Sequence, residues 1–177
     1  MPEIARDSRV VAVDWERLFG VLDRIAGGRS ARLRVPEAAR EALPVRRAFR
    51  TVAWVLGLVF LVGGAAVVQA VRVSGAGEVV HPVVWWRLLV IFAIAATLFY
   101  FWFRAQAGWW WAYSRLRLFS VVFPVIAVST CLIPGLYPGW MIIEQLVFSA
   151  LVLICFVLLS QPEVRSAYRK PAPPSAS

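Results

Sequence analysis

Apolar residues fill four long blocks of the chain, and charged residues are nearly absent from these blocks. The blocks cover about residues 51–71, 83–103, 116–137 and 139–160. Each is close to the ~20 residues that a helix needs to cross a bilayer. Because lipid offers no hydrogen-bond partners to a peptide backbone, each block is predicted to cross as an α-helix. The pattern predicts an all-α integral membrane protein whose four transmembrane helices form a bundle over residues 49–161.

Proline and glycine mark the connections of this bundle. Residues 134–139 hold two prolines and two glycines between the last two blocks, which predicts a tight turn and an antiparallel hairpin. Pro124 stands in the middle of the third block and predicts a bent helix there.

The segments outside the blocks differ from one another in composition. Residues 1–48 are charged and are predicted to include a short amphipathic helix between Asp14 and Gly28. Its apolar face would comprise Trp15, Leu18, Phe19, Leu22 and Ile25. Pro36 can begin a second short helix, and Pro44 either ends that helix or begins the one that enters the membrane. Residues 162–177 finish in Pro-Ala-Pro-Pro-Ser-Ala-Ser and are predicted to be disordered.

The basic residues predict the orientation of the chain. Eleven of the nineteen Lys and Arg residues precede Thr51, and most of the others lie in the connection between the second and third blocks or in the C-terminal tail. The opposite side holds only Arg72 and Arg87. The positive-inside rule therefore predicts that both termini are cytoplasmic. The preference for Arg over Lys, with abundant Ala, Val and Gly, indicates a GC-rich bacterial genome and hence a bacterial cytoplasmic (inner) membrane.

Glu144 is the only acidic residue inside a predicted span. Ionisable groups at membrane depth are costly, so each one is a functional hypothesis. One interpretation is a proton- or cation-coupled transport site, and the other is a structural ion pair with Arg72 or Arg87 at the same level. Three further residues share its half of the helix and would form a polar stripe facing other helices: Gln145, Ser149 and Cys155.

Arginines beside the spans are candidate contacts for anionic lipid headgroups. They are Arg46, Arg47, Arg50, Arg104, Arg115 and Arg117. Their alternative role is to set the topology alone. The run Trp109–Trp111 lies among them and is predicted to anchor the connection at the membrane interface. A nucleic-acid partner is not expected, because this aromatic and basic segment directly joins two spans.

The sequence holds no recognisable catalytic or metal-binding motif. It has no phosphate-binding loop, no Cys-x-x-Cys pair and no cluster of Cys and His, so no catalytic residue, metal or cofactor is predicted. His81 is the single histidine and is expected to be exposed in an outer loop. An enzyme acting on a lipid-linked substrate would have to use His81 and Glu144 with the two outer arginines.

These patterns favour a non-enzymatic accessory or scaffold protein that associates with a larger envelope or transport complex. The N-terminal segment and the first span would make the contact. Ala53-x-x-x-Gly57 and Ala66-x-x-x-Ala70 in that span fit the spacing of close helix packing, either within one chain or between subunits. The alternative is a small oligomeric transporter or lipid-handling protein in which Glu144 is coupled to the outer arginines. The expected partners are the lipid bilayer, anionic lipids, and a membrane protein or further copies of the chain.

Overall fold

The computed structural model describes residue 28 and residues 33–77 and 80–170. Its elements are α2 (Glu37–Glu41), α3 (Leu43–Gly75), α4 (Pro82–Gln106), α5 (Trp110–Cys131), α6 (Gly139–Leu159) and α7 (Pro162–Ala167). The four helices α3 to α6 are long and apolar enough to span a membrane, as the sequence predicted for a multi-pass membrane protein. The predicted amphipathic helix near the N-terminus lies outside the described residues.

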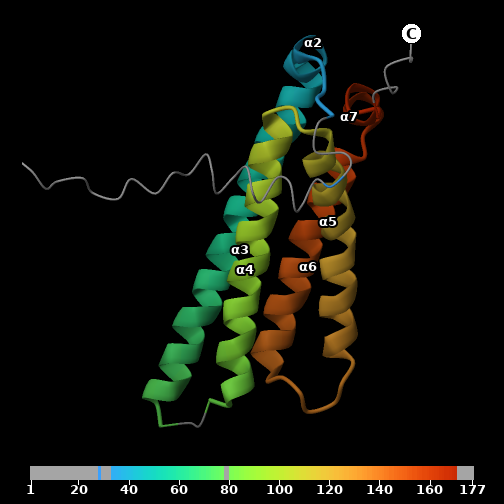
Figure 1. Ribbon diagram of the computed structural model, residues 1–177. Helices are drawn as coiled ribbons and strands as arrows, with labels where there is room; N and C mark the ends of the chain where they lie inside the picture. The colour runs from blue at the N-terminus through green and yellow to red at the C-terminus, as the bar shows by residue number, and fades with distance from the viewer. Residues whose placement is uncertain (1–27, 29–32, 78–79, 171–177) are drawn as a thin grey trace, which may run out of the picture.

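The four long helices form one bundle (Figure 1). Helix α3 packs against α4 and α6, and α5 packs against the same two helices, so α3 and α5 lie diagonally opposite. Helices α2 and α7 and the connection from α4 to α5 lie together at one end, which we call the α7 end (residues 33–50, 104–117 and 159–170). The connections from α3 to α4 and from α5 to α6 lie at the other end, which we call the far end.

Helix α3 is much longer than its apolar block. Pro44 occupies the start of the helix, where a missing N–H is tolerated, so this proline begins α3 instead of ending α2. The 33 residues of α3 span about 50 Å at ~1.5 Å per residue, against ~30 Å for a hydrocarbon core. The first turns of α3 therefore extend the bundle beyond the apolar region at the α7 end.

Helix α5 is shifted along the chain relative to its predicted bounds of 116–137. It begins at Trp110, two residues after Gly108, which turns the backbone with a φ of +90°. It ends at Cys131, because Pro134 disfavours helical conformation in the residue before it and Gly135 adopts a φ of +73°. Residues 132–137, which the apolar pattern assigned to the span, belong to the connection at the far end.

The core uses one of the two small-residue patterns of α3. Ala66 and Ala70 are buried against Val84 and Leu88 of α4 and Met141 of α6. The Ala66-x-x-x-Ala70 pattern is therefore occupied within the chain. In contrast, Gly57 and Gly64 have no neighbouring side chain within 4 Å of the place where a Cβ would stand.

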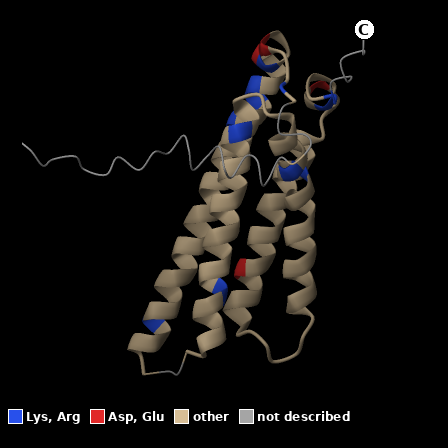
Figure 2. Ribbon diagram, viewed as in Figure 1, with Lys and Arg blue, Asp and Glu red and all other residues tan. Residues whose placement is uncertain are grey.

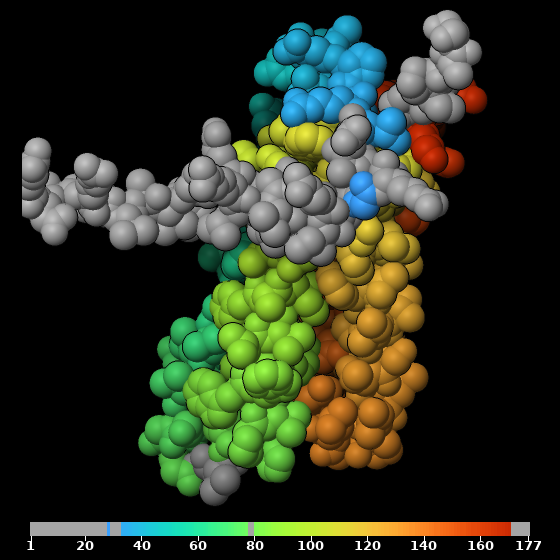
Figure 3. Space-filling model, in the orientation of Figure 1, coloured from blue at the N-terminus to red at the C-terminus, as the bar shows by residue number. Residues whose placement is uncertain are grey.

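Large apolar side chains cover the outside of the bundle. Examples from three helices are Leu61 of α3 at 69% exposure, Leu89 of α4 at 59% and Ile143 of α6 at 66%. An aqueous protein rarely exposes continuous apolar surface of this extent, whereas lipid tails would cover it. The space-filling view shows α4 and α5 side by side on one face, with α6 visible between them in the half nearer the far end (Figure 3).

The start of the C-terminal tail is ordered, unlike the prediction for residues 162–177. Residues 162–167 form α7. The side chains of Val164 in this helix and of Tyr168 directly after it are buried. These two residues are four positions apart, so they lie on one face of a helix and give it an apolar side to bury. The polar composition of residues 162–177 favoured the prediction of disorder over this short helix. Residues 171–177 lie outside the described residues.

Candidate functional site

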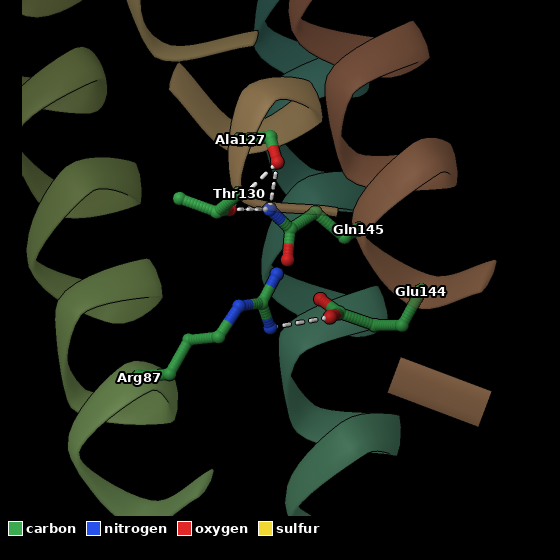
Figure 4. A network of polar contacts seen from close by, with 5 residues as sticks. All are labelled: Arg87, Ala127, Thr130, Glu144 and Gln145. Atoms are coloured by element: carbon green, nitrogen blue, oxygen red, sulfur yellow. Dashed lines mark hydrogen bonds and ion pairs between the residues drawn. The ribbon is translucent and has the colours of Figure 1, made fainter. Parts of the chain in front are cut away.

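Glu144 on α6 is paired with Arg87 on α4. The Nη1 atom of Arg87 lies 2.9 Å from Oε2 of Glu144, and the two side chains are 10% and 9% exposed (Figure 4). Arg72, the other arginine that the sequence offered as a partner, is exposed near the end of α3 and is not part of this pair. The structure therefore brings together two of the three predicted residues.

Arg87 also contacts an aromatic ring. The guanidinium carbon of Arg87 lies 5.1 Å from the ring centroid of Tyr137, within the range of a cation–π contact. The other carboxylate oxygen of Glu144, Oε1, is buried and has no protein partner among the described residues. One charged hydrogen bond thus neutralises Glu144, while half of its acceptor capacity remains unused.

The neighbouring Gln145 ties α6 to α5. Its side-chain amide donates to the backbone carbonyl of Ala127 and to Oγ1 of Thr130, the latter at 2.7 Å (Figure 4). The amide oxygen of Gln145 and the hydroxyl of Ser149 are buried without a protein partner in the described part of the chain. The predicted polar stripe therefore does face other helices, because Gln145, Ser149 and Cys155 are all buried.

A cavity of about 150 Å³ lies beside these groups. Residues of α4, α5 and α6 line it together with Tyr137 of the connection, and its polar lining consists of Arg87, Thr130, Tyr137 and Gln145. The remaining lining is apolar, with Phe123 and Phe148 as the largest side chains. A space of this size and polarity can accommodate a few water molecules or a small ion at the ion pair.

His81 has a local structural contact. It is exposed, and its Nδ1 atom accepts a hydrogen bond from the backbone N–H of Val83 at 3.4 Å. This contact caps the first turn of α4, where backbone donors lack helical partners. No described contact joins His81 to Glu144 or to Arg87, so the structure does not bring His81 together with the other residues of the enzyme interpretation.

At the opposite end of the bundle, side chains donate to backbone carbonyls of other elements. The bonds are Tyr168 Oη to Ala105 O at 2.8 Å, Tyr113 Oη to Leu159 O at 2.7 Å, Trp110 Nε1 to Tyr168 O at 3.0 Å and Trp102 Nε1 to Phe49 O at 2.9 Å. They join α3, α4, α5, α6 and the segment after α7. Burial raises the pKa of Tyr168, so its hydroxyl stays protonated and remains a donor well above neutral pH. The α7 end is therefore a fixed assembly.

The tryptophan run packs largely against its own chain, which differs from the predicted interfacial anchor. Trp111 is 2% exposed and belongs to the core. Trp109 lies between two guanidinium groups, with Arg34 at 4.1 Å and Arg104 at 5.3 Å from its ring centroid. The physical reason is that Gly108 begins α5 early, which turns the run from a connecting loop into the first turn of a packed helix.

The predicted headgroup arginines all lie at the α7 end, where most of the described charge gathers (Figure 2). Arg46, Arg47, Arg50 and Arg115 are exposed, whereas Arg104 and Arg117 are half-buried. Arg117 is held by a 3.1 Å bond from Nε to Oγ of Ser160.

Three further basic residues, which the sequence presented only as indicators of orientation, also lie at this end. Arg165, Arg169 and Lys170 lie with Arg117 around a groove of about 560 Å³. The spacing of Val164 and Tyr168, which orders α7, was the available signal for this arrangement.

The described residues contain no cluster of three or more His, Cys, Asp and Glu side chains that could hold a metal ion. Comparison with known proteins found no protein family, no curated protein and no solved structure that matches this chain. Any statement about its function therefore rests on its own sequence and geometry.

Proposed function

We propose that this chain is a non-enzymatic accessory or scaffold protein of a bacterial cytoplasmic membrane, associated with a larger envelope or transport complex. The observation that carries the proposal is the fixed basic assembly at the α7 end. Helices α3 to α6 and the segment after α7 are tied together there by side chains that bond to backbone carbonyls, and Arg40 adds a bond from α2 to the Gln106 carbonyl at 3.1 Å. A rigid surface outside the apolar region is what a docking protein presents.

The charge of this surface supports an orientation with both termini in the cytoplasm. The described residues of the α7 end include eleven basic and three acidic side chains. Elsewhere the described chain holds two basic residues, Arg72 and Arg87, and the latter is neutralised by Glu144. Positive charge is retained on the cytoplasmic side during insertion, and it also attracts anionic lipids of that leaflet.

The outer face of α3 is the surface that we assign to a membrane-embedded partner. Gly57 and Gly64 leave open space on this helix, and Trp54 and Leu61 beside them are 74% and 69% exposed. Small residues allow the backbone of another helix to approach closely, and the large side chains beside them supply contact area.

Site-specific photo-crosslinking tests this assignment. Benzoylphenylalanine in place of Leu61 should yield a discrete adduct with another membrane protein in native membranes, identified by mass spectrometry after purification in mild detergent. Ile143 on α6 has nearly the same exposure, 66%, and is the matched control position. Equal labelling of many proteins from both positions, or no adduct from position 61, would contradict a partner on α3.

A second candidate function is a small oligomeric transporter in which Glu144 is the coupling residue. The observation that favours it is the cavity of about 150 Å³ beside Arg87, together with the unpartnered acceptor atoms of Glu144 and Gln145. Substitution Glu144→Gln keeps the size of the side chain and removes the charge. A transporter of this kind would lose proton- or cation-driven flux in proteoliposomes, whereas unchanged flux would remove Glu144 from that role.

A further inference from the structure

A groove lies at the α7 end, on the side of α5 and α6. It has a volume of about 560 Å³, which is within the size range of small-molecule sites. Its lining comes from α5, from Phe156 of α6, and from α7 with the residues that follow it. The site lies apart from the Arg87–Glu144 pair, because both residues of the pair stand near the starts of α4 and α6, at the far end of the bundle.

Four cationic side chains border this groove, and no acidic residue lines it. They are Arg117, Arg165, Arg169 and Lys170. Arg117 is positioned by its Nε bond to Ser160 and by the ring of Phe156, 5.4 Å from its guanidinium carbon, which leaves its terminal nitrogens without a bond to the described protein. Lys170 stands 5.7 Å from the ring centroid of Trp110. The cations are thus arranged around the groove without carboxylates to neutralise them.

The floor and one side of the groove are apolar. Leu118, Val121 and Val122 of α5 continue from the basic rim along the helix in the direction of the far end. Tyr113 and Tyr168 stack beneath the rim with ring centroids 4.5 Å apart, and both hydroxyls are already bonded to backbone carbonyls. The groove therefore passes from cationic to apolar within one continuous surface.

We propose that this groove binds a single anionic phospholipid from the surrounding leaflet. Its phosphate would lie among Arg117, Arg165, Arg169 and Lys170, and one acyl chain would lie along Leu118, Val121 and Val122. Arginine matches phosphate geometry with two parallel donors, and the apolar wall matches an acyl chain. A soluble phosphate compound would leave that wall uncovered, which is why the surface fits an amphiphile.

This site differs from general attraction of the basic end to an anionic membrane. General attraction is spread over every basic residue and recruits many exchanging lipids. A built groove retains one molecule and selects for both headgroup charge and an acyl chain. The two cases predict different results for substitutions that remove the same charge at different positions.

The test uses the purified full-length chain in detergent, with lipids counted by native mass spectrometry. The probes are phosphatidylglycerol, phosphatidylcholine with the same acyl chains, and free glycerol 3-phosphate. The groove variant is Arg117→Gln with Arg169→Gln, and the matched variant is Arg46→Gln with Arg50→Gln, which removes equal charge at the same end outside the groove. Val122→Trp fills the apolar side without changing any charge.

We expect one retained phosphatidylglycerol on the wild type and on the Arg46/Arg50 variant. The groove variant should bind phosphatidylglycerol about 30-fold more weakly, because two basic groups that attract the anionic headgroup are removed. Val122→Trp should weaken it as well, which keeps the test decisive if the double variant folds poorly.

Three results of lipid counting would overturn the proposal. They are retention of the lipid by both groove variants, equal loss in the Arg46/Arg50 variant, and retention of phosphatidylcholine as strongly as phosphatidylglycerol. Binding of glycerol 3-phosphate as tight as that of the lipid would assign the site to a soluble anion and would also refute it.

Discussion

Arg87 and Glu144 illustrate how a buried ion pair is both costly and necessary. Moving two charges out of water carries a desolvation penalty that their attraction only partly returns, so the pair is weak evidence of net stabilisation. Once the pair is buried, however, neither residue can lose its partner cheaply. The carboxylate of Glu144 already leaves Oε1 without a protein bond, so it depends on Arg87 for its single charged contact.

Removal of Arg87 alone should therefore destabilise the bundle more than removal of both charges. Arg87→Met is expected to cost about 3 kcal/mol, and Arg87→Met with Glu144→Leu should recover most of that loss. The measurement is the thermal unfolding midpoint in detergent for wild type, both single variants and the double variant. Additive effects of the two single variants would show that the pair is not coupled.

Gly108 occupies a position where the backbone conformation and a neighbouring side chain both favour glycine. Its φ of +90° disfavours any side chain, and an added Cβ would stand 3.0 Å from Nε of Arg40. Gly77 has a similar φ of +85° with open space around it, so Gly77→Ala is the matched control.

Gly108→Ala should lower stability more than Gly77→Ala does. Both variants incur the conformational penalty of a positive φ, but only the first displaces Arg40 from the Gln106 carbonyl, a bond worth about 1 kcal/mol. Comparison of the two unfolding midpoints checks this expectation. Equal midpoints would mean that Arg40 contributes nothing to the α7 end.

At the scale of helices, composition predicted which segments are helical better than where they begin and end. Four apolar blocks gave four long helices because a backbone in lipid has no other way to satisfy its hydrogen bonds. The bounds depend on local features that composition averages out. Pro44 could either end or begin a helix, and Gly108 moved the start of α5 to Trp110.

Helix α7 was missed because its stability is tertiary. Six residues cannot form a stable helix alone, and the sequence around them is polar. Val164 and Tyr168 order it only because α3, α4 and α5 provide a surface on which to bury them. The contact of Tyr168 with the Ala105 carbonyl joins residues 63 positions apart and leaves no trace in local composition.

Truncation of Tyr168 should therefore release α7 without unfolding the bundle. Tyr168→Ala removes the stacked ring and the bond to Ala105, while the α3 core around Val52 and Val59 is left intact. Hydrogen exchange should rise strongly over residues 162–168 and change little over residues 52–59. Tyr168→Phe, which keeps the ring and loses only the hydroxyl, should give an intermediate increase. A uniform rise over the whole chain would contradict a separately docked α7.

At the scale of the whole molecule, the site was only partly foreseeable. The sequence indicated Glu144 as the unusual residue and named two possible partners, because an acid at membrane depth requires compensation. It could not choose Arg87 over Arg72, since both lie near the same level and the choice depends on how α4 and α6 are rotated. For the groove beside α7 the sequence offered only the spacing of Val164 and Tyr168, which does not show that the tail folds back onto α5.

Reporter fusions in a bacterial host test the proposed orientation. Alkaline phosphatase, which is active only outside the cytoplasm, should be active when joined after Gly77 or after Gly135. It should be inactive when joined after Gly108. Activity of the Gly108 fusion would place the α7 end outside the cytoplasm and would remove the basis for a cytoplasmic scaffold.

The bond of Tyr168 to the Ala105 carbonyl and its stacking on Tyr113 also determine where the chain leaves the bundle after α7. Lys170 follows Tyr168 by two residues and borders the basic groove, so a label attached directly after Lys170 would stand at the rim of that groove. A compact label on a short tether would compete for that surface, whereas a longer spacer would leave it accessible. Lipid counting with both tether lengths would reveal such interference.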